Sequence, residues 1–144
     1  MFDTNIYDLI FDKGINLNLI KNKGQFYITN VQLSEIKNIA NESRKTKLLK
    51  IIEDLNQIQV NLESGIWLDD LFWDDNQIWI DNISDSCQTL LGNAINSHRW
   101  KDALIGEVAK RHSLTLITND NRFKQRAELS KIETISFNEF LILS

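Results

Sequence analysis

The sequence predicts an α/β fold in which helices cover both faces of a mainly parallel sheet. Short apolar runs rich in β-branched residues alternate along the chain with segments whose apolar residues recur at helical spacing. In the run Leu114–Thr118, apolar and polar residues barely alternate, which is typical of a strand buried on both faces. Strands separated by helices are the pattern of proteins built in three α/β/α layers.

Length and composition indicate one folded domain. The chain has 144 residues, of which 42% are hydrophobic and 25% are charged. Because it contains five glycines and no proline, we find no flexible linker and expect residues 1–144 to form a single domain. The formal net charge of −4 argues against a surface that binds nucleic acid throughout.

Three features predict a cytoplasmic protein without a membrane segment. Cys87 is the single cysteine and has no partner for an internal disulfide, which fits a reducing compartment. The longest apolar run, Phe140–Leu143, is far shorter than the roughly 20 residues of a transmembrane helix. Asp3 lies where a secretion signal would carry basic residues and then an apolar stretch.

The first part of the chain predicts strands and helices in alternation. Phe26–Thr29 is an apolar run of β-favouring residues between Gly24 and Asn30, as expected of a strand. The clearest helix has one apolar stripe, made of Leu48, Ile51, Ile52, Leu55 and Ile58. The other elements we expect are a short strand at Met1–Asp3, a helix through Ile6–Ile10, a helix or turn in Gly14–Lys21, and a helix that Asn30 caps and that reaches Ile39.

Residues 59–83 predict no definite structure. Their two apolar runs, Ile66–Leu68 and Ile78–Ile80, fit a strand, a helical turn or an irregular segment equally well. After them we expect helices over Ser84–Ser97, Lys101–His112 and Phe123–Leu129, strands over Leu114–Thr118 and Glu133–Ser136, a turn at Asn119–Asn121, and a final helical turn in Asn138–Leu143.

Four acidic residues occur where such a fold collects functional groups, beyond the carboxyl ends of its strands. Asp3 closes the first strand, and Asp120 lies two residues beyond Leu114–Thr118. Glu35 falls about one turn into the helix after the second strand, and Asp102 begins the helix that leads into the third. We therefore expect four carboxylates to converge at one edge of the sheet.

Converging carboxylates predict a cation between them. Each negative charge raises the pKa of its neighbours unless a positive charge is close. Mg²⁺ and ions like it prefer oxygen ligands, and a bound ion can activate water and neutralise charge on a phosphoryl group. The acids therefore point to metal-dependent phosphodiester hydrolysis. The chain has twelve aspartates and eight glutamates, so a role of Asp3 and Asp120 as simple helix caps stays open.

The segments around these acids resemble the successive motifs of PIN domains. They are Asp3-Thr4-Asn5, Glu35, Trp100–Ile105, and Leu116–Asp120 followed by Phe123. The resemblance covers nearly the whole chain and implies an α/β/α nuclease in which Mg²⁺ or Mn²⁺ binds the catalytic acids Asp3, Glu35, Asp102 and Asp120. It also implies supporting roles for Thr4, Asn5, Thr118 and Asn119.

Many PIN domains are ribonuclease toxins of bacterial toxin–antitoxin modules, the VapC-like group. The resemblance therefore implies an endoribonuclease that leaves 5′-phosphate and 3′-hydroxyl ends, is restrained by an antitoxin protein and forms a homodimer. Arg122 departs from the family, because many relatives have an acid at that position. This departure and residues 59–83 leave the four acids in place, so they concern the choice of substrate rather than the activity.

Basic and aromatic residues leave several alternatives open. Arg122, Lys124 and Arg126 follow Asp120 directly and are candidates for holding an RNA phosphate beside the metal. The basic residues Arg44, Lys45, Lys47 and Lys50 form either a solvated helix face or an RNA contact. The tryptophans Trp67, Trp73, Trp79 and Trp100 belong either to the core or to a protein interface.

Two other functions compete with the nuclease. The first is a PIN-like module that binds protein or RNA without catalysis. The second is a phosphatase or phosphotransfer domain, which would need a second acid adjacent to its nucleophilic aspartate or two residues on. Asp3-Thr4-Asn5 lacks that second acid, so the sequence argues against the phosphatase.

Overall fold

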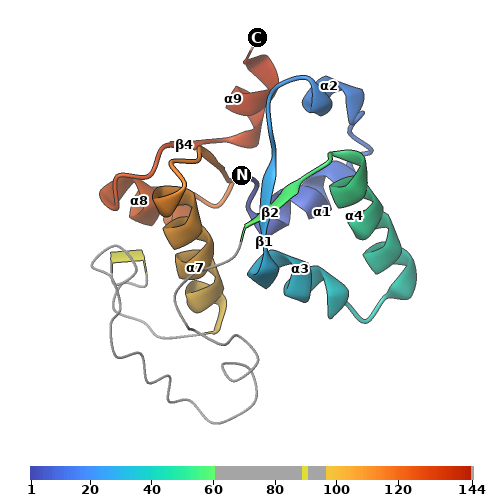
Figure 1. Ribbon diagram of the computed structural model, residues 1–144, viewed down its shortest axis with the longest axis horizontal. Helices are drawn as coiled ribbons and strands as arrows, with labels where there is room; N and C mark the ends of the chain where they lie inside the picture. Colours follow the sequence, from blue (N-terminus) through green and yellow to red (C-terminus); the bar gives the residue numbers. More distant parts are fainter. Residues whose placement is uncertain (61–88, 91–96, 144) are drawn as a thin grey trace.

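The computed structural model of the chain describes residues 1–60, 89–90 and 97–143 (Figure 1). Helices and short strands alternate along these residues, which confirms the predicted α/β class. The elements are α1 (Thr4–Asp12), α2 (Asn18–Lys21), β1 (Tyr27–Thr29), α3 (Asn30–Lys37), α4 (Glu42–Asp54), β2 (Ile58–Val60), α7 (Ser97–Arg111), β3 (Leu116–Ile117), α8 (Asn121–Leu129), β4 (Thr134–Ile135) and α9 (Phe137–Ile142).

The strands pair in parallel, as the crossover helices require. β1 pairs with β2, with Tyr27 opposite Ile58, and β3 pairs with β4, with Leu116 opposite Thr134. The predicted first strand is reduced to a parallel bridge between Phe2 and Ile117. The beginning of the chain therefore lies beside β3, and Asp3 follows directly.

Helices cover the strands on two sides. In Figure 1, α1, α3 and α4 lie on one side of the strands, and α7 and α8 lie on the other. One apolar cluster centres on Phe2, which is fully buried. The ring of Phe2 contacts those of Tyr7, Phe26, Phe137 and Phe140. Because Phe2 immediately precedes Asp3, this cluster also holds the first acid in place.

The second cluster packs α7 against α8 and β3. Its buried members include Trp100, Ile105, Leu116 and Phe123. Trp100 is thus a core residue, which agrees with the core alternative for this tryptophan. The cluster anchors α7, which carries Asp102, and α8, which begins directly after Asp120.

Three predicted boundaries are wrong. Thr29 caps α3 in place of Asn30, because its hydroxyl accepts from the Gln32 amide while the Gln32 side chain accepts from the Thr29 amide. α4 ends before Ile58, because Asn56 adopts a left-handed conformation with φ of 48°. Ile58 therefore lies in β2 and is not part of the apolar stripe of α4.

The third correction concerns Asp102, which does not begin its helix. α7 starts at Ser97, so Asp102 lies in its second turn. Buried Trp100 extends the apolar face of α7 by one turn ahead of Ala103 and Leu104.

Several predictions lie outside the described residues. They concern Ile66–Leu68, Ile78–Ile80, most of Ser84–Ser97, and Trp67, Trp73 and Trp79. Of residues 59–83, the structure describes Gln59 and Val60, which belong to β2. No helix within the described ranges is long and apolar enough to cross a membrane.

Candidate active site

The four predicted acids line one pocket of about 650 Å³. Asp3 and Asp120 lie immediately before α1 and α8, Glu35 lies in α3, and Asp102 lies in α7. Residues that are far apart in the sequence thus meet because each lies near the carboxyl end of a strand or on a helix packed beside it. The structure therefore brings the predicted quartet together.

Asp3 is the most deeply buried of the four, with 3% of its surface exposed. The Thr118 hydroxyl donates a hydrogen bond of 2.8 Å to its Oδ2. Burial raises the pKa of Asp3 to about 6, and the negative charges of Asp120 and Glu35 add to this rise, whereas the Thr118 bond opposes it. Although Asp3 is the N-cap residue of α1, its side chain makes no capping hydrogen bond. A simple capping role therefore does not account for its position.

Asp120 does cap its helix. Its Oδ1 accepts hydrogen bonds from the amides of Arg122 at 2.8 Å and Phe123 at 3.0 Å. The Asp120 amide donates to the Thr118 hydroxyl, which in turn donates to Asp3. Thr118 therefore connects the two acids, and Asp120 combines a capping role with a place at the pocket.

Glu35 is held at both carboxylate oxygens. The Thr4 hydroxyl donates to Oε2 at 2.8 Å, and the Lys101 ammonium lies 2.8 Å from Oε1. Lys101 was not among the residues predicted for the site. The signal was its place directly before Asp102 in α7, but only the packing of α7 beside α3 brings it to Glu35.

Asp102 pairs with a second cation. The Arg126 guanidinium lies 3.2 Å from its Oδ2 and also packs against the Phe123 ring. Burial raises the pKa of Asp102 to about 7, and the negative charge of Asp3 raises it further; Arg126 opposes this rise. Two carboxylates of one pocket therefore have raised pKa values, as expected where like charges are buried together.

The remaining predicted residues take different positions. Thr4 and Thr118 hold acids, as described above, and Asn5 lines the pocket. The Asn119 side chain accepts from the Phe137 amide and so links the end of β3 to α9. Arg122 and Lys124 are not among the described residues that line the pocket; Arg122 is exposed, and the Lys124 ammonium lies 3.5 Å from Glu139.

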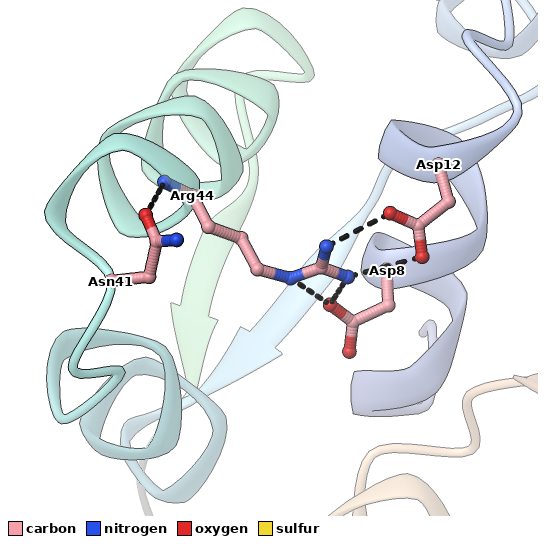
Figure 2. A network of polar contacts seen from close by, with 4 residues as sticks. All are labelled: Asp8, Asp12, Asn41 and Arg44. Carbon is pink, nitrogen blue, oxygen red and sulfur yellow. Dashed lines mark hydrogen bonds and ion pairs between the residues drawn. The ribbon is translucent and has the colours of Figure 1, made fainter.

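Asp8 is a further acid at this pocket, and it shares the single positive charge of Arg44 with Asp12. Figure 2 shows the Arg44 guanidinium reaching from α4 to α1, where it binds both Asp8 and Asp12. The Asn41 side chain caps the start of α4 by accepting from the Arg44 amide. Arg44 therefore ties two helices together at the rim of the pocket.

The carboxylate oxygens at the pocket suit a hard divalent cation, although the described acids are not arranged around a common metal position. Carboxylate oxygens are the ligands that Mg²⁺ and Mn²⁺ prefer. Burial, and then the neighbouring negative charges, raises the pKa values of Asp3 and Asp102, and a bound cation would oppose this rise. Within the described residues, no three acidic, histidine or cysteine side chains are close enough together to hold a metal as they stand. Lys101 and Arg126 balance two of the acids.

The fold is α/β, and four acids line one pocket beside its parallel strands. Residues 1–129 match the PIN domain family, and the chain belongs to it. PIN domains are generally nucleases that act on RNA with divalent metals. The match confirms the resemblance to PIN domains. Comparisons with curated proteins and with solved structures found no match.

Proposed function

We propose that this PIN domain is an endoribonuclease that uses Mg²⁺ or Mn²⁺ to hydrolyse RNA phosphodiester bonds. The observation that carries the proposal is the meeting of Asp3, Glu35, Asp102 and Asp120 at one pocket. Two of these acids, Asp3 and Asp102, have raised pKa values, which is common where function requires buried carboxylates.

Each side chain has a role in this proposal. Asp3, Asp102 and Asp120 would hold the ion, and Glu35 would complete the site directly or through water. A bound divalent ion supplies an activated water and neutralises charge on the phosphoryl group. Thr118 orients Asp3, and Arg126 orients Asp102.

The RNA outside the pocket needs its own contacts. We propose Arg122 and Lys124 for this role, because they lie in the first turn of α8, directly after Asp120. Their positive charges would attract RNA phosphates, and binding would then weaken as the salt concentration rises.

The biological setting we propose is a toxin–antitoxin module. The support is the resemblance to the VapC-like group together with membership of the PIN family. A free ribonuclease endangers its own cell, so we expect an antitoxin protein that covers the pocket, and a homodimeric toxin. Size-exclusion chromatography with light scattering tests the dimer, and a monomer at high protein concentration would contradict it.

The nuclease proposal is tested by incubating a mixed RNA panel with the purified protein and Mn²⁺ or Mg²⁺. Parallel reactions contain EDTA, Asp102→Asn, or the control Asp54→Asn, which removes a charge from α4 away from the pocket. We expect wild type and Asp54→Asn to cleave, and Asp102→Asn to lose at least about 100-fold in rate because metal binding is impaired. Equal cleavage by wild type and Asp102→Asn would refute the site.

The second candidate function is a binding module that has lost catalysis. The ion pairs Lys101–Glu35 and Arg126–Asp102 favour it, because they balance two acids without any metal. Thermal unfolding with and without Mn²⁺ separates the two functions. An ion that binds only the folded state adds about 2.7 kcal/mol to the free energy of unfolding when its free concentration is 100 times its Kd. An unchanged midpoint up to millimolar Mn²⁺ would favour the binding module.

A further inference from the structure

Lys101 holds a distinctive place in the pocket. Its ammonium lies 2.8 Å from Glu35 Oε1, and only 23% of its side chain is exposed. Thr4 donates to the other oxygen of Glu35, so the carboxylate is held from both sides. A carboxylate that is fixed in this way also fixes the position of the cation it binds. Thr4 and Glu35 therefore hold a positive charge at the wall of the acidic pocket.

Other nearby cations are turned to different partners. Among the described residues that line the pocket, Lys101 is the only lysine or arginine. Arg126 is not among the described residues that line the pocket; its guanidinium pairs with Asp102 and lies over the Phe123 ring. Arg44 binds Asp8 and Asp12 at the rim. An anion that enters the pocket would thus meet the Lys101 ammonium.

The charges of the site suit one divalent ion better than two. The quartet Asp3, Glu35, Asp102 and Asp120 carries four negative charges when ionised, and Lys101 and Arg126 balance two of them. Asp8 also lines the pocket and shares Arg44 with Asp12, so it is counted apart from the quartet. The quartet with its two cations keeps a formal charge of −2, which equals the charge that one divalent cation neutralises. A second divalent ion would leave the site with a net positive charge and would approach the Lys101 ammonium.

We propose that Lys101 binds the phosphate of the RNA bond to be cut, and that its ammonium supplies the positive charge that a second metal ion would otherwise supply. An ammonium has three donors, so it can keep Glu35 and still donate to a phosphate oxygen. Glu35 then acts as a positioning residue for Lys101. This inference rests on the proposed nuclease function for its substrate, RNA.

The first test measures RNA binding without cleavage. A labelled single-stranded RNA of mixed sequence is titrated by fluorescence anisotropy in Ca²⁺ at several salt concentrations. We expect Lys101→Met to bind about 10-fold more weakly than wild type and to lower the slope of log affinity against log salt by about 0.7, the value for one phosphate contact on a single strand. Lys101→Arg keeps the charge and should retain most of the affinity.

Lys110→Met is the matched control, because Lys110 is exposed in the last turn of the same helix. It should change the affinity less than about twofold. Circular dichroism and the unfolding midpoint establish that each variant is folded. If Lys101→Met is folded and has the affinity and salt slope of wild type, the proposal is overturned.

The second test asks whether Glu35 acts through Lys101. If it does, Glu35→Gln weakens RNA binding in wild type but has no further effect in Lys101→Met. Equal effects of Glu35→Gln in both backgrounds would remove the positioning role.

The third test counts metal ions in the wild-type protein by Mn²⁺ titration, with free Mn²⁺ followed by electron paramagnetic resonance. We expect one ion per chain, and a slightly higher Mn²⁺ affinity in Lys101→Met, because a like charge has been removed. Two ions per chain would contradict the part of the proposal that concerns the second metal. If wild type binds no Mn²⁺ but loses RNA affinity in Lys101→Met, the nuclease function fails while phosphate binding by Lys101 stands.

Discussion

Asp3 and Asp102 are the two acids of the described residues whose pKa values are raised, to about 6 and about 7. Burial is the first cause of both raised pKa values, and the neighbouring acids add to it. The hydrogen bond from Thr118 and the ion pair with Arg126 lower the energetic cost of ionising these carboxylates without removing it. The metal-free protein therefore carries an electrostatic strain that a bound cation would relieve.

This strain predicts how stability depends on pH in EDTA. The pKa of Asp102 is about 7 in the folded protein and near 3.8 in the unfolded chain, so the folded state keeps a proton that the unfolded state has released. The stabilising contribution of the Asp102 proton to the free energy of unfolding is fully present below pH 4 and is lost as the pH rises through 7. Asp102→Asn should therefore be more stable than wild type at pH 8, by about 1 to 2 kcal/mol after allowance for solvent screening, and the difference should shrink toward pH 4.

Thermal or urea unfolding across this pH range measures the difference. Comparison of the two proteins cancels the opposite contribution of the Met1 amino group, whose pKa burial lowers to about 5. Asp54→Asn is the control for the loss of one negative charge from an acidic chain. A difference between wild type and Asp102→Asn that stays constant from pH 4 to 8 would contradict the assigned burial cost.

Helices and strands bring the acids to the pocket by their ends and their packing. α1 and α8 each begin directly after an acid that follows a strand or bridge, whereas α3 and α7 present Glu35 and Asp102 from within. The relative placement of these helices thus sets the shape of the pocket. α4 carries no member of the quartet, but Arg44 binds it to α1 through Asp12 and through Asp8, which lines the pocket (Figure 2).

Arg44→Met should loosen this link between helices. The substitution removes the hydrogen bonds to Asp8 and Asp12 and keeps an apolar stem near the Phe11 ring. We expect a fall of a few degrees in the unfolding midpoint at low salt, and a smaller fall in 1 M NaCl, because ions screen exposed charge pairs.

Lys45→Met is the matched control for Arg44→Met. Its ion pair with Glu42 lies within α4 and does not connect helices. It should therefore change the midpoint less than Arg44→Met does. Equal midpoints for the two variants at low salt would show that the link between α1 and α4 adds no stability.

The molecule as a whole is organised around the first residues of the chain. Phe2 is buried among aromatic rings from α1, α9 and the segment that leads into β1. The Asp3 amide donates to Ile117 in β3, so the same segment joins the core to the pocket. A substitution that disrupts the packing of this core should therefore also disturb the pocket, because Asp3 would lose its support.

Phe2→Ala should lower the free energy of unfolding by about 3 to 5 kcal/mol, because it leaves a cavity among packed rings. Urea unfolding measures the loss, and Mn²⁺ titration of the folded fraction should show weaker binding as Asp3 loses its support. Leu129→Ala, at a side chain that is 74% exposed, is the control and should stay within about 0.5 kcal/mol of wild type. A loss below 1 kcal/mol in Phe2→Ala would argue against this packing.

Much of the fold and the site could be read from local patterns. The strand near Phe26, the helix that carries Leu48 and the cap at Asp120 follow from periodicity and capping chemistry, which act over a few residues. The end of α4 was missed because Ile58 continues the helical spacing by coincidence, while the left-handed Asn56 breaks the helix. The start of α7 was missed because Trp100 belongs to the core and reveals its helical face only through packing.

The choice of the four acids also came from the chain alone, because motifs and strand ends are local properties. The resemblance also indicated Thr4 and Thr118 as supporting residues, but not which acid each of them would contact. Thr118 meets Asp3 across 115 residues of sequence, and Thr4 meets Glu35 across 31. Lys101 and Arg126 acquire their partners only when α7 packs beside α3 and α8. Side-chain neighbours so distant in the chain are set by the burial of apolar surface, which carries no local signal at the charged positions themselves.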